Sequence, residues 1–356
     1  MPPTKKAANG QFYTARASYI LEGLAGPPPT TTRVLEPFAG AGDLLSWLTA
    51  QGYTGPVEAY DIDPKTPAAT KRDTLLDPPE YAGAWVLTNP PYLARNKSPN
   101  KAVYDRYDTN DLYKAFLLSL ITEGHEPAGG ILIIPVGFFL SPRDLDLRVR
   151  AAFLSRFRIT AVRYFEETVF PDTPTTVVAF SFVLSAEALT EQAIPWTRKP
   201  DGAQQTFTLR AADGWIIGGD IYKLTIPPAI KIRRHVEGQV LREGEQLTGL
   251  TLTALDSGTA DGRICLTHQP GYVYPAKDTS RSFATLCIQG RVLTEAEQVR
   301  IAAEFNAFLE ERRTATWSLF LPQYRESKEY ARKRIPFELA YALVGWIIGR
   351  LNPSAP

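Results

Sequence analysis

The sequence has few of the residues that build disulfide frameworks and metal sites. Only two of its 356 residues are cysteine and three are histidine. Cys265 and Cys287 are spaced in a way that suits no zinc knuckle, and two thiols do not make a disulfide scaffold. We therefore predict no metal site and a reducing, cytoplasmic setting.

Long apolar runs and an excess of charge are also missing. The start of the chain, MPPTKKAANG, has no apolar signal core. The late run FELAYALVGWIIG (337–349) is too short to span a bilayer and carries Glu338, so it predicts a buried C-terminal helix and no membrane partner. The formal net charge of +1 means that any nucleic-acid surface must come from local clusters of Lys and Arg.

Strand-like and helix-like segments alternate along the first half of the chain. The apolar content of 44% is enough for a substantial core. We expect helices at about 15–24, 44–51, 112–123 and 145–157, and strands at 33–35, 57–63, 85–88 and 129–139. Two β-rich runs, 159–167 and 175–185, predict an antiparallel hairpin at the edge of the sheet. This alternation predicts an α/β sheet with helices on both faces.

The pattern of predicted strands and helices changes after about residue 186. Pro195, Pro200 and Gly202 indicate a linker, and the remainder shows short strands, many turns and one long late helix. We therefore expect a disordered stretch at 1–10, a catalytic domain at 11–190 and a smaller α+β region at 200–356.

Polar residues stand at the ends of successive predicted strands. VLEPFAGAGDLL (34–45) reads as a strand, a glycine-rich turn and a helix, in which Gly40 and Gly42 would let the backbone approach a ligand. The next strand ends in Asp61-Ile62-Asp63, where Asp61 could accept hydrogen bonds from a ribose diol and Asp63 could cap the following turn. Asp73 follows a third short strand and could accept from an adenine amine, or cap a helix. Ligands of open α/β sheets collect at the carboxyl ends of strands, so these ends predict one shared crevice.

A fourth strand ends in TNPPY (88–92). Proline cannot donate a backbone hydrogen bond and fixes its own φ, so two prolines stiffen a loop as well as ending a strand. An ordinary exit loop would have the same composition. The upstream glycine turn and the two acidic strand ends favour a functional loop instead.

The order of these motifs resembles that of the S-adenosylmethionine-dependent adenine-N6 DNA methyltransferases of type II restriction–modification systems, in their gamma class. The cofactor loop of that family is resembled by LEPFAGAGD, and the motif that precedes it by QFYTARASYILEGL. The ribose-binding acid is resembled by YDIDP, and the adenine-binding acid by RDTL. The catalytic loop is resembled by TNPPY. EETVFPDTPTTVVAFSF (166–182) resembles the late hairpin, and SLFLPQYRESKEYARKRIPFELAY resembles the C-terminal end. The resemblance implies a Rossmann-like methyltransferase sheet, S-adenosylmethionine as cofactor, and double-stranded DNA as partner.

The resemblance also implies roles for individual residues. The cofactor-binding residues would be Tyr13, Thr14, Glu36, Phe38, Ala39, Gly40, Asp61, Ile62, Asp73, Thr74 and Asn89. The catalytic residues would be Asn89, Pro90, Pro91 and Tyr92. Tyr92 and Phe182 would stack on the two faces of the target base, although an aromatic residue in an apolar strand, such as Phe182, is more often part of the core.

The chemistry explains why such an enzyme needs an amide beside prolines. The lone pair of the adenine amine is delocalised into the ring, so the amine is a poor nucleophile. Two acceptors, the side-chain oxygen of Asn89 and the carbonyl of Pro90, would favour the tetrahedral nitrogen of the transition state. The base must first leave the duplex. Methylation of a cytosine carbon would need a thiolate, and the first cysteine is Cys265.

The C-terminal region would grip the flanking DNA. Two basic clusters, 223–243 and 321–334, contain five Lys or Arg each, although such runs are more often solvated faces. The candidate DNA-binding residues are Lys231, Arg233, Arg234, Lys277, Arg281 and Arg325. We expect a monomer of bacterial or viral origin, and a cognate restriction endonuclease would be a separate chain.

Other amino-methyltransferases use the same loop on cytosine-N4, on an RNA base or on a protein glutamine. Cytosine-N4 enzymes usually carry Ser at the position of Asn89. The RNA and glutamine enzymes tend to add a domain before the cofactor loop, whereas here about 170 residues follow the hairpin. A non-catalytic DNA-binding module with this fold is a further alternative, and an intact NPPY loop with Asp61 and Asp73 argues against it.

Overall fold

A computed structural model of the protein describes residues 14, 16–122, 124–170, 175–256, 263–326 and 331–351, with the backbone alone at 323–326 and 331. The chain forms two compact units, Met1–Ile216 and Ile217–Pro356. The described part of the first unit contains α2 (Ala17–Ile20), β1 (Val34–Glu36), α3 (Asp43–Ala50), β2 (Val57–Asp61), β3 (Thr70–Lys71), β4 (Trp85–Thr88), α4 (Ala102–Tyr107), α5 (Leu112–Ser119), β5 (Gly129–Pro135), α6 (Gly137–Leu140), α7 (Asp144–Arg156), β6 (Phe157–Phe165), β7 (Val177–Leu184), β8 (Glu191–Lys199) and β9 (Gln204–Arg210).

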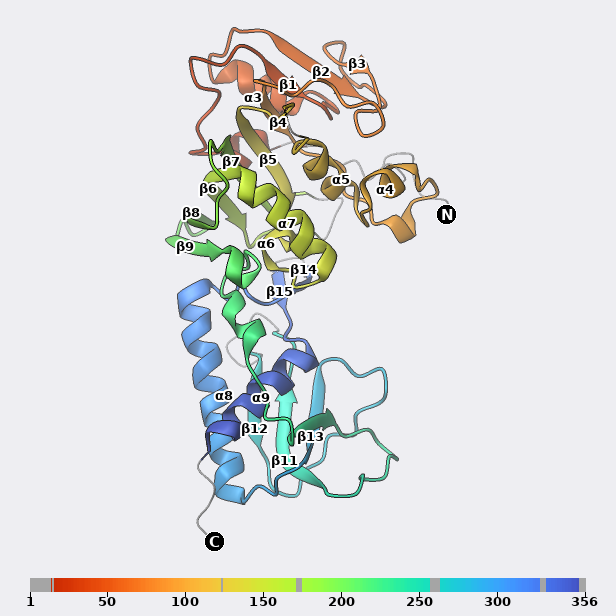
Figure 1. Ribbon diagram of the computed structural model, residues 1–356, viewed down its shortest axis with the longest axis vertical. Helices are drawn as coiled ribbons and strands as arrows, with labels where there is room; N and C mark the ends of the chain where they lie inside the picture. The colour runs from red at the N-terminus through yellow and green to blue at the C-terminus, as the bar shows by residue number, and fades with distance from the viewer. Residues whose placement is uncertain are drawn as a thin grey trace. The chain divides into compact units, whose positions relative to one another are not determined.

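These strands form one sheet in the order β3-β2-β1-β4-β5-β7-β6-β8-β9 (Figure 1). Strands β1 to β5 run parallel, and β7 is antiparallel to both of its neighbours. From β1 the chain moves outward through β2 and β3, and it then returns to β4 on the other side of β1. Because crossovers are right-handed, these opposite excursions place α3 and α5 on opposite faces of the sheet.

The predicted fold class, an α/β sheet with helices on both faces, is therefore confirmed, and the chain also has a smaller second sheet. Parallel strands buried on both faces read as continuous apolar runs, as in β4 and β5. The point where the strand order reverses lies between β1 and β4. Open sheets of this kind bind ligands there, at the carboxyl ends of the strands.

The stretch expected to be a linker is part of this sheet. Strands β8 and β9 extend it beyond β6, so the β6–β7 hairpin does not lie at the edge, and the first unit runs to Ile216. Side chains of β8 alternate between exposed and buried from Glu191 to Trp196. Pro195 is tolerated because pairing with β6 begins only at Trp196. The period-two alternation was the signal for a strand, and the prolines concealed it.

Two other boundaries differ from the prediction. Strand β5 ends at Pro135 rather than near residue 139, because residues 137–140 form the short helix α6. The first predicted helix is shorter, with α2 covering Ala17–Ile20.

The second unit has its own sheet and core. Strands β10 (Lys231–Arg234), β11 (Glu245–Thr253), β12 (Cys265–His268) and β13 (Phe283–Gln289) pair antiparallel in the order β10-β13-β11-β12. Helix α8 (Glu295–Thr316) packs on β12, and α9 (Phe337–Arg350) packs on α8 and β10. A short hairpin joins β14 (Gln323–Glu326) and β15 (Ala331–Lys333). The buried C-terminal helix predicted from residues 337–349 is α9.

Helix α8 was not predicted, although it is 22 residues long. The helix begins with a capping box, in which Thr294 accepts from the amide of Glu297 and the Glu297 side chain accepts from the amide of Thr294. A Thr followed three positions later by Glu is the sequence signal for such a start.

Candidate active site

The glycine turn after β1 carries the first polar group of the site. Gly40 and Gly42 have φ of 51° and 88°, a region that L side chains rarely adopt. The amide of Ala39 donates to the carbonyl of Tyr60 on β2 at 2.8 Å. The turn is therefore fixed against the neighbouring strand, at the start of α3.

Glu36, the last residue of β1, is fully buried. Its Oε1 accepts hydrogen bonds from the amide of Phe38, at 3.0 Å, and from the hydroxyl of Thr88. Its Oε2 has no hydrogen-bond partner among the residues that the structure describes. Burial raises the pKa of Glu36 to about 8, and the nearby charge of Asp61 acts in the same direction. A buried carboxyl with an unused oxygen is suited to a cationic ligand group.

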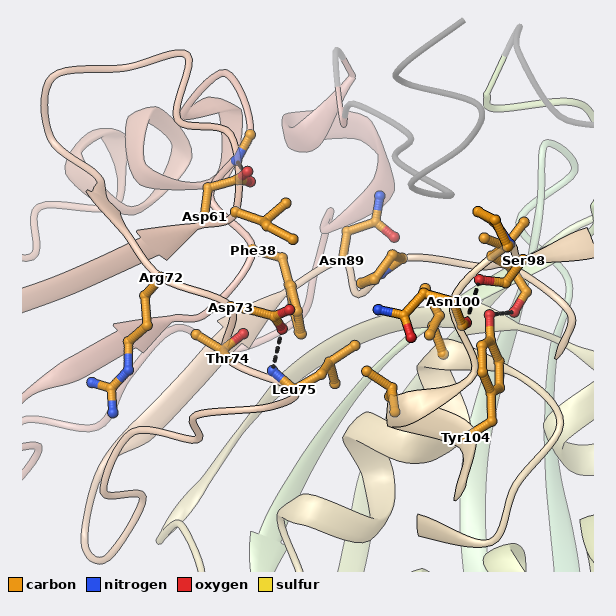
Figure 2. Close-up of a pocket in the computed structure, with 17 residues that line it drawn as sticks. Phe38, Asp61, Arg72, Asp73, Thr74, Leu75, Asn89, Ser98, Asn100 and Tyr104 are labelled. Carbon is orange, nitrogen blue, oxygen red and sulfur yellow. Dashed lines mark hydrogen bonds between the residues drawn. The ribbon is translucent and has the colours of Figure 1, made fainter. Parts of the chain in front are cut away.

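Asp61 ends β2 and ties it to the glycine turn. Its Oδ2 accepts from the amide of Gly40 at 2.8 Å, and its Oδ1 accepts from the amide of Asp63 at 2.7 Å. Both bonds hold the carboxylate in one orientation, in which it lines a cavity together with Ile62 (Figure 2). A carboxylate oxygen has a second lone pair, so Asp61 can still accept from a ligand hydroxyl.

Asp73 and Thr74 follow β3 on the same side. Oδ1 of Asp73 accepts from the amides of Leu75 and Leu76, each at 3.2 Å. The buried hydroxyl of Thr74 donates to the carbonyl of Pro37 at 3.0 Å, which joins this turn to the loop after β1. Asp73 thus caps a local turn, and it also lines the cavity.

The TNPPY loop leaves β4 beside these turns. Asn89 and Pro91 line the cavity, while Pro90 and Tyr92 are buried behind it. The amide nitrogen of Asn89 donates to the hydroxyl of Thr14 at 3.1 Å. The hydroxyl of Tyr92 contacts Oδ1 of Asn89 and the carbonyl of Ile133. Asn89 is therefore held from two sides by hydroxyl groups.

One cavity collects most of the predicted cofactor residues (Figure 2). The predicted residues that line it are Phe38, Gly40, Asp61, Ile62, Asp73, Thr74, Asn89 and Pro91. Thr14 and Glu36 are hydrogen-bonded to the lining residues Asn89 and Phe38, and Ala39 lies between Phe38 and Gly40 in the chain. Tyr13 lies outside the described residues.

The opposite wall of the cavity was not predicted. It is formed by residues between β4 and α5 together with the first residue of α5, namely Leu93, Ser98, Pro99, Asn100, Val103, Tyr104 and Leu112. Arg72 and Leu75 complete the lining. In the sequence this segment is a polar stretch with no strand or helix signal at 93–101, so nothing in its pattern indicated a wall.

Phe182, predicted to stack on the target base, does not lie at this site. It is paired with Gly130 and Ile159 and is 1% exposed. Its ring packs against Phe157 and Phe153, with centroids 5.1 and 5.5 Å away. Strand β7 is antiparallel to β5, so the residue level with the carboxyl end of β5 is Val177, about 16 Å along the strand. The prediction was wrong because it counted to the end of the strand that points away from the cavity.

The turn between β6 and β7 does lie at the carboxyl edge of the sheet, since Phe165 ends β6 and Val177 pairs with Pro135. Phe170 stands in this turn and is 2% exposed. Its ring is therefore buried, as is that of Phe165 at the same edge, and neither side chain lines the cavity.

Two of the predicted DNA-binding arginines have structural partners. Arg233 forms two hydrogen bonds with Glu245, at 2.7 and 2.6 Å, and these lower the pKa of Glu245 to about 2. The guanidinium of Arg234 donates to the carbonyls of Asp278 and Ser280. The prediction for this pair is corrected: both groups are used inside the second unit.

The remaining DNA-binding candidates differ in position. Lys231, Lys277 and Arg281 are exposed. Lys277 and Arg281 flank the loop that Arg234 holds, and the amide of Ser280 closes it on the carbonyl of Lys277 at 2.8 Å. The side chain of Arg325 lies outside the described residues. Within the described chain no helix is long and apolar enough to cross a membrane.

No model of a protein family and no curated protein matches the chain. Solved structures match it at low identity. A modification subunit of a proposed type I restriction enzyme from Vibrio vulnificus YJ016 is 17% identical, with a TM-score of 0.42, over 56% of this chain and 50% of that one. The methyltransferase subunit of a type I restriction–modification system from Streptococcus thermophilus is 17% identical, with a TM-score of 0.39, over 52% and 47%.

A protein from Listeria monocytogenes described as a class I S-adenosylmethionine-dependent methyltransferase is 11% identical, with a TM-score of 0.36, over 51% of this chain and 61% of that one. The chain thus spans about half the length of the first two structures. At these identities the likeness concerns the fold alone, and the site must be interpreted from its own geometry.

Proposed function

We propose that the chain is an S-adenosylmethionine-dependent DNA methyltransferase that modifies the N6 amine of a flipped adenine, as the modification enzyme of a restriction–modification system. The observation that carries the proposal is the convergence of four strand ends. Asp61, Asp73 and Asn89 line one cavity, and the buried carboxyl of Glu36 lies behind it.

The residues present fit the three parts of the cofactor. The unused oxygen of Glu36 is suited to the ammonium of the methionine, because a cation would satisfy a buried acceptor. Asp61 is oriented to accept from the ribose hydroxyls. Asp73 would accept from the adenine amine. S-adenosylmethionine would supply an electrophilic methyl group on sulfur.

Asn89 and Pro90 would activate the target amine. A carbonyl oxygen has two lone pairs, so Oδ1 of Asn89 can accept an N–H while it contacts the hydroxyl of Tyr92. Hydrogen bonds from the amine to two fixed acceptors are strongest when its nitrogen becomes tetrahedral, which lowers the barrier to transfer.

The second unit would bind the duplex around the flipped base. The loop at 277–281 is fixed by Arg234 and presents Lys277 and Arg281 to solvent. Beside it, Tyr272 and Phe283 are 45% and 41% exposed. Cations next to exposed aromatic side chains are suited to phosphates and bases.

Methyl transfer from tritium-labelled cofactor tests the proposal. Purified protein should label unmethylated plasmid DNA, and enzymatic digestion should recover N6-methyladenine. Asn89→Ala should retain cofactor binding and lose transfer by several orders of magnitude. Label in RNA or polypeptide alone, label on cytosine, or full activity of the variant would overturn the proposal. Single-molecule sequencing of DNA from a methylation-free expression strain would then give the site.

A further inference from the structure

The outer wall of the cavity is a segment held at several points. The hydroxyl of Tyr107 donates to the carbonyl of Leu75 at 3.1 Å, and the guanidinium of Arg106 donates to the carbonyl of Leu76. The hydroxyl of Tyr104 donates to the carbonyl of Leu93 at 2.9 Å. The first two bonds fasten the end of the segment 93–107 to the turn that follows β3, and the third closes the segment on itself. The side chains of this segment that line the cavity are therefore held in a fixed arrangement.

Asn100 projects from this segment into the cavity (Figure 2). Its Oδ1 accepts from the amide of Ala102 at 2.9 Å, and its carbonyl accepts from the hydroxyl of Ser98 at 2.7 Å. Because a backbone amide can only donate, the first bond decides which end of the side-chain amide is oxygen. The nitrogen, Nδ2, must then point away from Ala102, and Figure 2 shows it directed toward the side of the cavity that carries Asp73.

The two side chains present opposite hydrogen-bonding groups to the same space. Asp73 uses Oδ1 for the amides of Leu75 and Leu76, which leaves Oδ2 as an acceptor. Asn100 offers a donor whose direction is fixed. Adenine carries an amine donor beside a ring-nitrogen acceptor, so it matches an acceptor and a donor placed side by side.

We propose that Asn100 is a specificity residue for the nucleobase of the cofactor and acts together with Asp73. Asp73 accepts from the exocyclic amine, and Nδ2 of Asn100 donates to a ring nitrogen beside it. The inference rests on the proposed use of S-adenosylmethionine. It extends that proposal by assigning base discrimination to the segment between β4 and α5.

A 6-oxo purine would fail at this pair. Its carbonyl oxygen would face the carboxylate of Asp73, and two acceptors cannot share a hydrogen bond. Discrimination of this type is strong because the rejected ligand leaves polar groups of the site without partners.

The test is calorimetric titration with S-adenosylhomocysteine, its 6-oxo analogue S-inosylhomocysteine, and the 1-deaza and 7-deaza analogues. The informative variant is Asn100→Asp, which keeps the acceptor for the amide of Ala102 and removes the donor. Asn96→Asp is the matched control, because Asn96 lies on the same segment, is exposed and does not line the cavity.

Wild-type protein should prefer the adenine compound to the 6-oxo compound by tenfold or more. Asn100→Asp should weaken binding of S-adenosylhomocysteine by about tenfold, while Asn96→Asp stays within about twofold. For the analogue that lacks the contacted ring nitrogen, wild type and Asn100→Asp should bind alike.

Two results would overturn the inference. One is an unchanged affinity of Asn100→Asp for S-adenosylhomocysteine. The other is an equal loss of affinity for both deaza analogues between wild type and Asn100→Asp, which would indicate a general disturbance of the cavity. Wild-type protein that binds none of the four compounds would instead overturn the proposed function, and this inference with it.

Discussion

The hydroxyl of Tyr92 contacts the amide oxygen of Asn89 and lies 2.7 Å from the main-chain carbonyl of Ile133. A phenol has a single proton, so it can donate to only one of these two oxygens at a time. The proton of Tyr92 therefore influences which end of the Asn89 amide is presented to the cavity. Tyr92 thus has a positioning role that the expected stacking role did not include.

Tyr92→Phe separates these two roles, because it keeps the ring and removes the hydroxyl. We expect kcat to fall about 10- to 100-fold with little change in cofactor affinity, as the lost hydrogen bond allows the amide of Asn89 to turn. Single-turnover methylation measures the change. Wild-type kcat in this variant would show that the ring alone matters.

Replacement of Asp61 should weaken cofactor binding. Asp61→Asn retains the shape but offers one acceptor where the amides of Gly40 and Asp63 require two. We expect the dissociation constant for S-adenosylmethionine to rise at least about tenfold. Asp63→Asn is the control, because Asp63 does not line the cavity. Equal calorimetric affinities for both variants would contradict the assignment.

The buried carboxyl of Glu36 should make stability depend on pH. Its pKa rises from 4.5 to about 8 on folding, so between these values the unfolded chain has released a proton that the native protein keeps. The free energy of unfolding should therefore fall as pH rises from about 4.5 to about 8, by up to about 1.4 kcal/mol per pH unit.

Urea denaturation at several pH values, with Glu36→Gln beside the wild type, isolates this effect. The wild type should lose stability relative to the variant as pH rises through this window. Parallel pH profiles for the two proteins would exclude a protonated Glu36.

Lys277 and Arg281 should contribute to DNA affinity through phosphate contacts. The double variant Lys277→Ala, Arg281→Ala should reduce the slope of log affinity against log salt by about 2. Arg300→Ala is a suitable control, since Arg300 lies on α8 in an exposed ion pair with Glu304. A salt slope equal to that of the wild type would remove this loop from the interface.

Phe182→Leu should act on stability and not on chemistry. The ring fills an aromatic core with Phe153 and Phe157, so we expect the free energy of unfolding to fall by about 1–3 kcal/mol. The kcat per folded molecule should stay at the wild-type level. A lower kcat of the fully folded Phe182→Leu variant would contradict this expectation and support a role of Phe182 in base stacking.

The parts of this protein that were predictable are those that local chemistry determines. Buried parallel strands leave continuous apolar runs, and Asp61, Asp73 and Asn89 each follow such a run directly. Their convergence then follows from the geometry of a parallel sheet. The NPPY loop was recognisable because proline, asparagine and tyrosine rarely end a strand together.

The errors have equally physical causes. The direction of β7 decides whether Phe182 or Val177 lies at the carboxyl edge of the sheet, and an apolar run does not indicate the direction of its strand. The pairing of Arg233 with Glu245 joins residues whose proximity depends on sheet register. Asn100 was not predicted because its sequence context, a polar stretch, is that of an ordinary loop residue. Its role depends on the hydrogen bond from the amide of Ala102, which orients its side chain.

Glu36 should couple the binding of a cationic ligand to the release of a proton. With a pKa of about 8, its carboxyl holds a proton in the ligand-free protein at neutral pH. An ammonium group that takes the place of this proton exchanges one positive charge for another. Binding would therefore release the proton of Glu36 into the medium and leave the net charge of the occupied site equal to that of the empty site. Because the buffer takes up this proton, the heat of binding would vary with the ionisation enthalpy of the buffer.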